Sequence, residues 1–175
     1  MKDSSRAKSL TNDEAFSRMA ALCSLSEHCE SEIREKLRKA AMPVSDIEDI
    51  VDRLYDEGFL DTARYCRAYS RDKLRFDHWG SVKIQQGLRM KGLPDADIRK
   101  AIADLYEELG DEYSRILQDT LQQKARTLPS PTDEGSDCDD DNANDYIRRG
   151  KLIRFAASRG FTPDEILDTL NALEA

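Results

Sequence analysis

The sequence has little of what enzymes, disulfide-bonded proteins and membrane proteins require. Its 175 residues include two histidines, one tryptophan and four cysteines, and only 7% are aromatic. No apolar stretch approaches the ~18 residues of a membrane helix, and the N-terminal segment MKDSSRAKSLTN lacks the apolar core of a signal peptide. The four cysteines form no C-x-x-C pair, which favours a reducing environment. We therefore expect a cytoplasmic protein that carries no disulfide bond and no membrane segment.

Catalytic and metal-binding constellations are also missing. Catalysis needs a nucleophile, a base and an orienting group in one pocket, but His28 and His78 lie far apart in the chain and no G-x-x-x-x-G-K phosphate loop occurs. Cys23, His28 and Cys29 lack the spacing of zinc ligands and a fourth partner. The sequence therefore predicts a protein that is not an enzyme and that has no cofactor.

An acidic stretch over 129–145 contains seven acids and no base. Four of its aspartates match ligand positions of a calcium-binding loop: Asp137, Asp139, Asp141 and Asp145. Asn142 stands in place of the glycine that makes the sharp turn, and Arg148 in place of the glutamate that completes the ligand shell. A cation at that position opposes metal binding, so we expect a solvated loop and no metal site.

The remaining charge is strongly polarised along the chain, although the formal net charge is -8. Residues 64–91 include eight basic residues and only two acids, Asp72 and Asp77. Residues 148–160 include five basic residues and no acid. Solvated helix faces normally intersperse both signs, so this asymmetry favours a binding surface for acidic protein, for DNA phosphates or for both. The candidate binding residues are Arg64, Arg67, Arg71, Lys73, Arg75, Lys83, Arg89, Lys91, Arg148, Arg149, Lys151, Arg154 and Arg159.

Trp79 has two interpretations. It lies with Phe76 in the basic stretch, where an aromatic ring could stack on a base or anchor an interface. Large aromatic side chains are usually mostly buried. The favoured interpretation is therefore that Trp79 packs between helices at the Gly80 turn.

Three stretches of the sequence are rough copies of one another: Ile33 to Leu54, Ile84 to Leu105 and Leu152 to Leu173. A shift of 51 residues places the first on the second, and a further shift of 68 residues adds the third. Self-similarity at this period is typical of an array of helical units that stabilise one another. With 39% hydrophobic and 35% charged residues, such helices bury one stripe and solvate the rest.

Capping motifs and glycines mark the ends of the helices. Three pairs place a hydroxyl three residues before a glutamate and predict capping boxes: Thr11 with Glu14, Ser45 with Glu48, and Thr162 with Glu165. Asp61 is suited to cap a further helix. Glycines suited to the left-handed position close helices at Gly58, Gly92 and Gly160. Apolar spacing adds helices over 30–40, 82–91, 95–109 and 111–128, and order that resumes near Ala143 and runs to Arg159.

No alternating apolar run is long enough for a strand, so the predicted fold is all-α. The expected architecture is an elongated array of three tandem three-helix repeats. A disordered N-terminal tail over 1–12 precedes a first repeat over 13–60 and a second over 61–110. The third repeat covers 111–175 and contains the acidic loop 129–145.

The order of several short motifs resembles the RecX family of recombination regulators. The motifs are Asp56-Glu57-Gly58-Phe59-Leu60-Asp61, Arg64-Tyr65-Cys66 with Tyr69, Trp79-Gly80, Ile84, Leu88, Lys91-Gly92-Leu93, Lys151-Leu152-Ile153-Arg154-Phe155, Arg159-Gly160-Phe161 and Ile166. The resemblance covers residues from about 13 to 174 and is specific as a combined pattern. The sequence departs from the family pattern at Thr62, at Ala41, where the other two repeats have glycine, and in its long acidic insert.

The resemblance implies a monomeric, non-enzymatic protein that lodges in the helical groove of a RecA filament on DNA. Such a protein would bridge neighbouring protomers, inhibit strand exchange and coupled ATP hydrolysis, and limit filament extension. The residues themselves leave open a helical module that binds DNA directly, with no recombinase involved. The low overall charge argues against tight autonomous DNA binding, because only the local basic patches release counterions.

Overall fold

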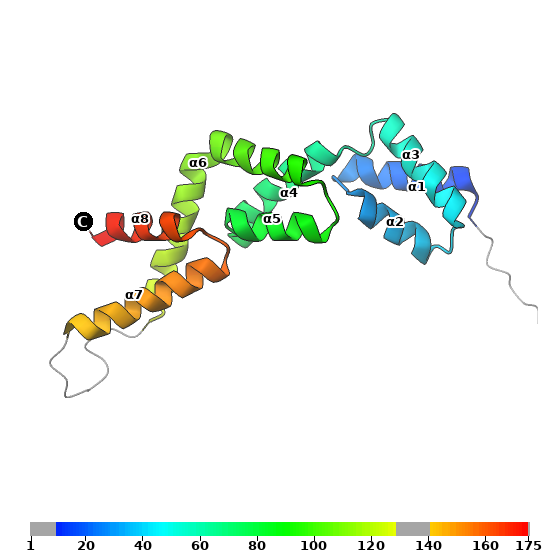
Figure 1. Ribbon diagram of the computed structural model, residues 1–175. Helices are drawn as coiled ribbons and strands as arrows, with labels where there is room; N and C mark the ends of the chain where they lie inside the picture. The colour runs from blue at the N-terminus through cyan, green and yellow to red at the C-terminus, as the bar shows by residue number, and fades with distance from the viewer. Residues whose placement is uncertain (1–9, 129–140, 175) are drawn as a thin grey trace, which may run out of the picture.

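A computed structural model describes residues 10–128 and 141–174 of the chain, and this part contains eight helices and no strand. The helices are α1 (Asn12–Leu25), α2 (Glu30–Lys39), α3 (Val44–Asp56), α4 (Thr62–Asp77), α5 (Ser81–Met90), α6 (Asp95–Arg126), α7 (Asp141–Ser158) and α8 (Pro163–Glu174). Figure 1 shows them as an elongated, bent array, with α1–α3 at one end and α7 and α8 at the other. The predicted all-α array of three-helix repeats is confirmed.

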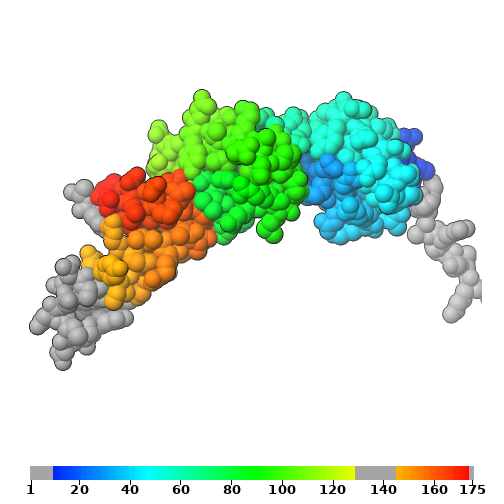
Figure 2. Space-filling view, in the orientation of Figure 1, coloured from blue at the N-terminus to red at the C-terminus, as the bar shows by residue number. Residues whose placement is uncertain are grey.

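Two hydrophobic cores stabilise the array. The first is built from α1–α3 and includes the fully buried Ile33 and Ile50. The second is shared by α4 to α8 and includes the fully buried Leu88 and Ile166. Among the described residues of the first repeat, Cys29 alone belongs to the second core. The second and third repeats therefore fold around one core, and the first repeat forms a lobe at one end of the molecule, coloured blue to cyan in Figure 2.

Two of the three predicted capping boxes are present. The Glu14 N–H donates to Thr11 Oγ1 at 3.2 Å, and the Glu14 carboxylate accepts from the Thr11 N–H at 3.0 Å. In the second box the Glu165 N–H donates to Thr162 Oγ1 at 3.4 Å, and the Glu165 carboxylate accepts from the Thr162 N–H at 2.7 Å. Asp61 caps α4 through its carboxylate, as predicted. These caps satisfy N–H groups that a helix start otherwise leaves without partners.

The predicted capping box of Ser45 and Glu48 is wrong. Pro43 is the N-cap of α3 and Val44 is its first residue, so Ser45 already lies within the first turn. The fixed φ of Pro43, here -57°, suits the entry into a helix at this earlier position. The Glu48 carboxylate instead accepts two hydrogen bonds from Arg34 of α2, at 2.6 and 2.7 Å.

The break predicted at Gly110 is present as a kink at Leu109, where two helical segments meet within α6. Leu109 has φ -129° and ψ 20°, outside the helical region, and its side chain packs against the second core. The bend turns the second half of α6 towards α7 and α8 (Figure 1). Helix α7 begins at Asp141, inside the stretch expected to be a loop, because a run of Asp and Asn residues is favourable at a helix N-terminus. Residues 129–140 of that stretch lie outside the described residues.

The C-terminus of α7 is bonded directly to the N-terminus of α5. The Gly80 N–H donates to Arg159 O at 2.9 Å and the Val82 N–H donates to Gly160 O at 3.0 Å. A Cβ added at Gly80 would lie 2.3 Å from Gly160 O, and one added at Gly160 would lie 2.3 Å from Lys83 Cβ. The two glycines therefore allow an approach of the backbones that no other residue permits.

We predict that Gly80→Ala strongly destabilises the second core. The added Cβ would meet a backbone carbonyl that cannot move without breaking the junction, so a loss of about 2 kcal/mol or more is expected. Gly110→Ala is the matched control, because a Cβ there has nothing within 4 Å and alanine is the better helix former. Thermal unfolding followed by circular dichroism checks this, and equal midpoints for the two variants would contradict it.

Ala41 offers a second test, because it has φ 55° where the equivalent Gly92 and Gly160 have φ 78° and 89°. This conformation costs an L-residue about 1–2 kcal/mol. Glycine avoids that cost, but it lowers the free energy of unfolding by ~0.4–1 kcal/mol because it gives the unfolded chain more conformational freedom. Ala41→Gly is therefore predicted to raise the free energy of unfolding by up to about 1 kcal/mol. Ala40→Gly, at a residue with φ -80°, should lower it. Urea unfolding measures both, and a lower midpoint for Ala41→Gly would show that Ala41 is not strained.

Candidate partner-binding surface

Lys91 is held inside the junction between the first and second repeats. Its Nζ donates to Glu32 of α2 at 2.5 Å, and the same carboxylate accepts from Tyr65 Oη at 3.0 Å. The Nδ1 atom of His28 lies 3.1 Å from it. Partial burial by itself raises the pKa of Glu32, but the hydrogen bonds from Lys91, His28 and Tyr65 outweigh it and lower the pKa to about 2. Glu32 is therefore ionised at neutral pH, and its charge is matched by Lys91.

Most other basic residues of the middle repeat are also matched by carboxylates. The pairs are Arg64 with Glu27 at 2.6 Å, Lys73 with Asp77 at 2.7 Å, Arg75 with Glu112 at 2.8 Å, Arg89 with Asp95 at 3.0 Å, and Arg71 with Glu108. Arg75 binds both oxygens of Glu112 and holds the pKa of that carboxyl below its usual range. Exposed pairs of this kind add little stability. They nevertheless offset much of the positive charge that the sequence concentrates in this stretch.

Three arginines of the third repeat donate hydrogen bonds to neighbouring helices. Arg148 donates to Ala125 O at 2.9 Å, Arg149 to Asn171 Oδ1 at 2.7 Å, and Arg159 to Asp77 O at 3.0 Å. Arg148 and Arg149 also line a groove of about 400 Å³ between α6, α7 and α8. Arg67 lies in the seam between α4 and α6, beside Asp104 and Glu108.

Trp79 is partly buried against the second core, which confirms that it packs between helices. The Nζ atoms of Lys73 and Lys83 lie 4.9 and 4.7 Å from the centre of its ring. These distances are typical of cation–π contacts. The ring is therefore engaged by the protein's own side chains.

Lys83, Lys151 and Arg154 differ from the paired cations of the middle repeat. Within the described part of the chain, none of the three forms an ion pair with a carboxylate. Lys151 and Arg154 are exposed on α7. Lys83 Nζ lies 3.5 Å from Ser158 O, at the end of α7. These three cations are available to a partner without the loss of an internal ion pair.

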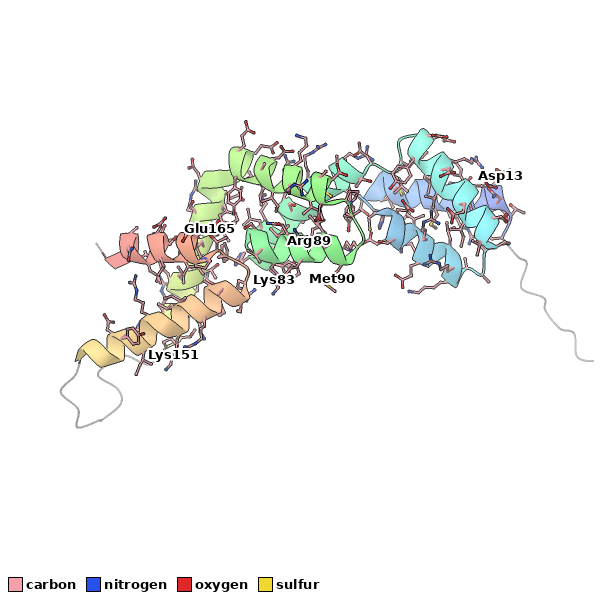
Figure 3. The ribbon with its side chains drawn as sticks, in the orientation of Figure 1. Asp13, Lys83, Arg89, Met90, Lys151 and Glu165 are labelled. Atoms are coloured by element: carbon pink, nitrogen blue, oxygen red, sulfur yellow. The ribbon has the colours of Figure 1, made fainter. Side chains whose placement is uncertain are left out.

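These cations lie along two stripes that we call the α5–α7 edge. The stripes consist of Lys83, Gln86 and Met90 on α5, and of Ile147, Lys151, Arg154 and Ser158 on α7. Residues at these three- and four-residue spacings share one face of a helix. Figure 3 shows Lys83 and Met90 along one side of α5 and Lys151 on α7. The charge pattern of the sequence identified the cations of this edge but not Met90 and Ile147. Both residues are apolar but lie away from the buried faces of Ile84 and Leu152, and this pattern in the sequence could have identified them as exposed.

No group of residues that could hold a metal ion occurs in the part of the chain that the structure describes. Asp137 and Asp139 of the calcium-loop pattern lie outside that part. No helix within the described ranges is long and apolar enough to cross a membrane.

Comparisons with known proteins agree with this architecture. A family model described as RecX, second three-helix domain, matches residues 61–102. The crystal structure of RecX from Lactobacillus salivarius is similar with a TM-score of 0.72 and 17% identity, covering 93% of this chain and 96% of that one. A crystal structure of regulatory protein RecX gives a TM-score of 0.71 at 22% identity and covers 91% of this chain and 71% of that one. At these identities the two structures show the fold.

Sequence relatives extend the similarity along most of the chain. Regulatory protein RecX of Prosthecochloris aestuarii is 28% identical over 159 residues, which cover 91% of this chain and 93% of the relative. Regulatory protein RecX of Ectopseudomonas mendocina is 33% identical over 141 residues, which cover 80% of this chain and 81% of the relative. With this identity over most of both chains, the protein belongs to the RecX family of regulatory proteins.

Proposed function

We propose that the protein is a regulator of homologous recombination and DNA repair that binds RecA filaments on DNA. It lodges in the helical groove of the filament and limits filament extension, strand exchange and coupled ATP hydrolysis. It acts as a monomer in the cytoplasm and carries out no catalysis of its own. The observation that carries the proposal is the 33% identity to a regulatory protein RecX across most of both chains.

The shape of the molecule supports this proposal. The helices form an elongated, bent array (Figures 1 and 2), so distant parts of the chain can contact separate protomers of a repeating partner. The second and third repeats share one core, so they present their surface as one preformed unit. A partner that docks on such a surface orders few additional residues, which reduces the entropic cost of binding.

Direct DNA binding without a recombinase is the second candidate. The observation in its favour is the cluster of Lys73, Lys83 and Trp79, which combines cations with an aromatic ring. However, the ring is partly buried and Lys73 is paired with Asp77. The formal net charge of -8 also opposes tight binding to phosphates. We therefore place this candidate below the first.

The proposed function predicts that the protein lowers the DNA-dependent ATPase of its cognate RecA at near-stoichiometric amounts and hydrolyses no ATP alone. The reason is that an inhibitor lodged in the filament acts through its partner, and the sequence has no phosphate-binding loop. Steady-state ATP turnover on single-stranded DNA provides the measurement, and the Gly80→Ala variant serves as a destabilised control. Unchanged turnover and filament lifetime at saturating protein would rule the proposal out.

A further inference from the structure

We infer that the α5–α7 edge is the surface that docks on the recombinase, and that it binds an acidic protein surface with an apolar centre rather than DNA phosphates. This inference rests on the proposed function and identifies the site that carries it out.

The charge of the edge is the first argument. No acid occurs in α5, and none occurs in α7 between Tyr146 and Ser158. Lys83, Lys151 and Arg154 have no ion-pair partner among the described residues, whereas the cations of α4 are largely matched by carboxylates. A partner carboxylate at the edge therefore gains a charge-assisted contact and displaces no internal ion pair, although Lys83 also contacts Ser158 O and the Trp79 ring. The edge complements a surface of negative charge.

The apolar residues of the edge decide between protein and DNA. Met90 is 89% exposed and lies between Arg89 and Lys91, and Ile147 is 51% exposed and precedes Arg148. Tyr146, next to Ile147, is 80% exposed. Protein interfaces are enriched in Met, Tyr and Arg, and their charged residues, Lys included, lie at the rim rather than at the centre. Contacts to phosphate are made by cationic and hydrogen-bonding groups, and Met or Ile contributes nothing to them. The composition of the edge therefore fits a protein partner.

The two stripes of the edge are held rigidly relative to each other. The two stripes belong to different repeats, but the bonds of Gly80 and Val82 to the end of α7 fix α5 and α7 relative to each other. The stripes extend for about 10 Å along α5 and about 16 Å along α7, at a rise of 1.5 Å per residue. Because no rearrangement is needed to align them, the edge is preorganised for binding.

A charge-reversal experiment tests the location of the site. Lys83, Lys151 and Arg154 are changed together to Glu, and binding to RecA filaments on single-stranded DNA is measured by fluorescence anisotropy. The matched control changes Arg18, Lys36 and Arg38 of the first repeat to Glu, because these cations also lack an ion-pair partner among the described residues. We expect the edge variant to bind about tenfold more weakly or worse, and the control variant to bind within about threefold of the wild type.

A second pair of variants tests the chemistry of the partner. Met90→Ser with Ile147→Ser is compared with Leu25→Ser and Val44→Ser, which change the similarly exposed Leu25 (86%) and Val44 (75%) of the first repeat. We expect the first pair to weaken filament binding about fivefold or more, as loss of an apolar contact does, and the second to leave it unchanged. Circular dichroism confirms that all variants are folded.

The outcomes separate the inference from the proposed function. If the wild type binds filaments and all four variants bind equally well, the α5–α7 edge is not the docking surface, and the proposed function is unaffected. If charge reversal weakens binding to filaments and to bare single-stranded DNA in parallel, while Met90→Ser with Ile147→Ser has no effect, the edge contacts DNA and the inference is wrong. If the wild type itself does not bind filaments, both are overturned.

Discussion

The arrangement of the second and third repeats depends on the contact between the C-terminus of α7 and the N-terminus of α5. A helix start and a helix end each leave backbone groups without partners, and here the carbonyls of Arg159 and Gly160 satisfy the N–H groups of Gly80 and Val82. Opposite ends of two helix dipoles also meet, which is favourable. Tyr113 completes the junction, because its hydroxyl accepts from the Ser81 N–H at 3.0 Å. Burial raises the pKa of Tyr113 well above its usual range, so the hydroxyl stays protonated and donates to Glu165 at 3.2 Å.

The junction between the first and second repeats uses the same plan with different chemistry. The repeat shift places Cys29 where Gly80 stands and Lys91 where Arg159 stands, and Tyr65 follows the start of α4 as Tyr113 follows the bend in α6. Because Cys29 carries a Cβ, this junction is made through side chains: Ser31 Oγ donates to Lys91 O at 2.9 Å, and Glu32 binds Lys91 and Tyr65. The first repeat thus keeps its own core and is attached by these polar contacts and by Cys29, which packs in the second core, while the other two repeats share one core.

Local features of the fold could be predicted from the sequence, because helix caps and apolar spacing act within one or two turns. The capping boxes at Thr11 and Thr162 and the left-handed glycines at 58, 92 and 160 follow this rule. The break before Gly110 was predicted correctly, and it takes the form of a kink at Leu109 within α6. The start of α3 was missed because Pro43 outweighs Ser45. The ion pairs were also beyond prediction. Arg71 meets Glu108, and Arg75 meets Glu112, only because α4 lies along α6, so a charge count along the chain overstates the basic character of the middle repeat.

The same packing explains why the α5–α7 edge keeps its cations. Two of the acids that pair with α4, Glu108 and Glu112, come from α6, which lies beside it, whereas no carboxylate of the described residues pairs with Lys83, Lys151 or Arg154. At physiological ionic strength exposed charges are screened beyond about 8 Å, so three edge cations on a chain of net charge -8 attract a partner only at short range. Most of the affinity must then come from contacts made after encounter. The exposed Met90 and Ile147 supply apolar surface for those contacts, and the glycine junction holds them in register with the cations.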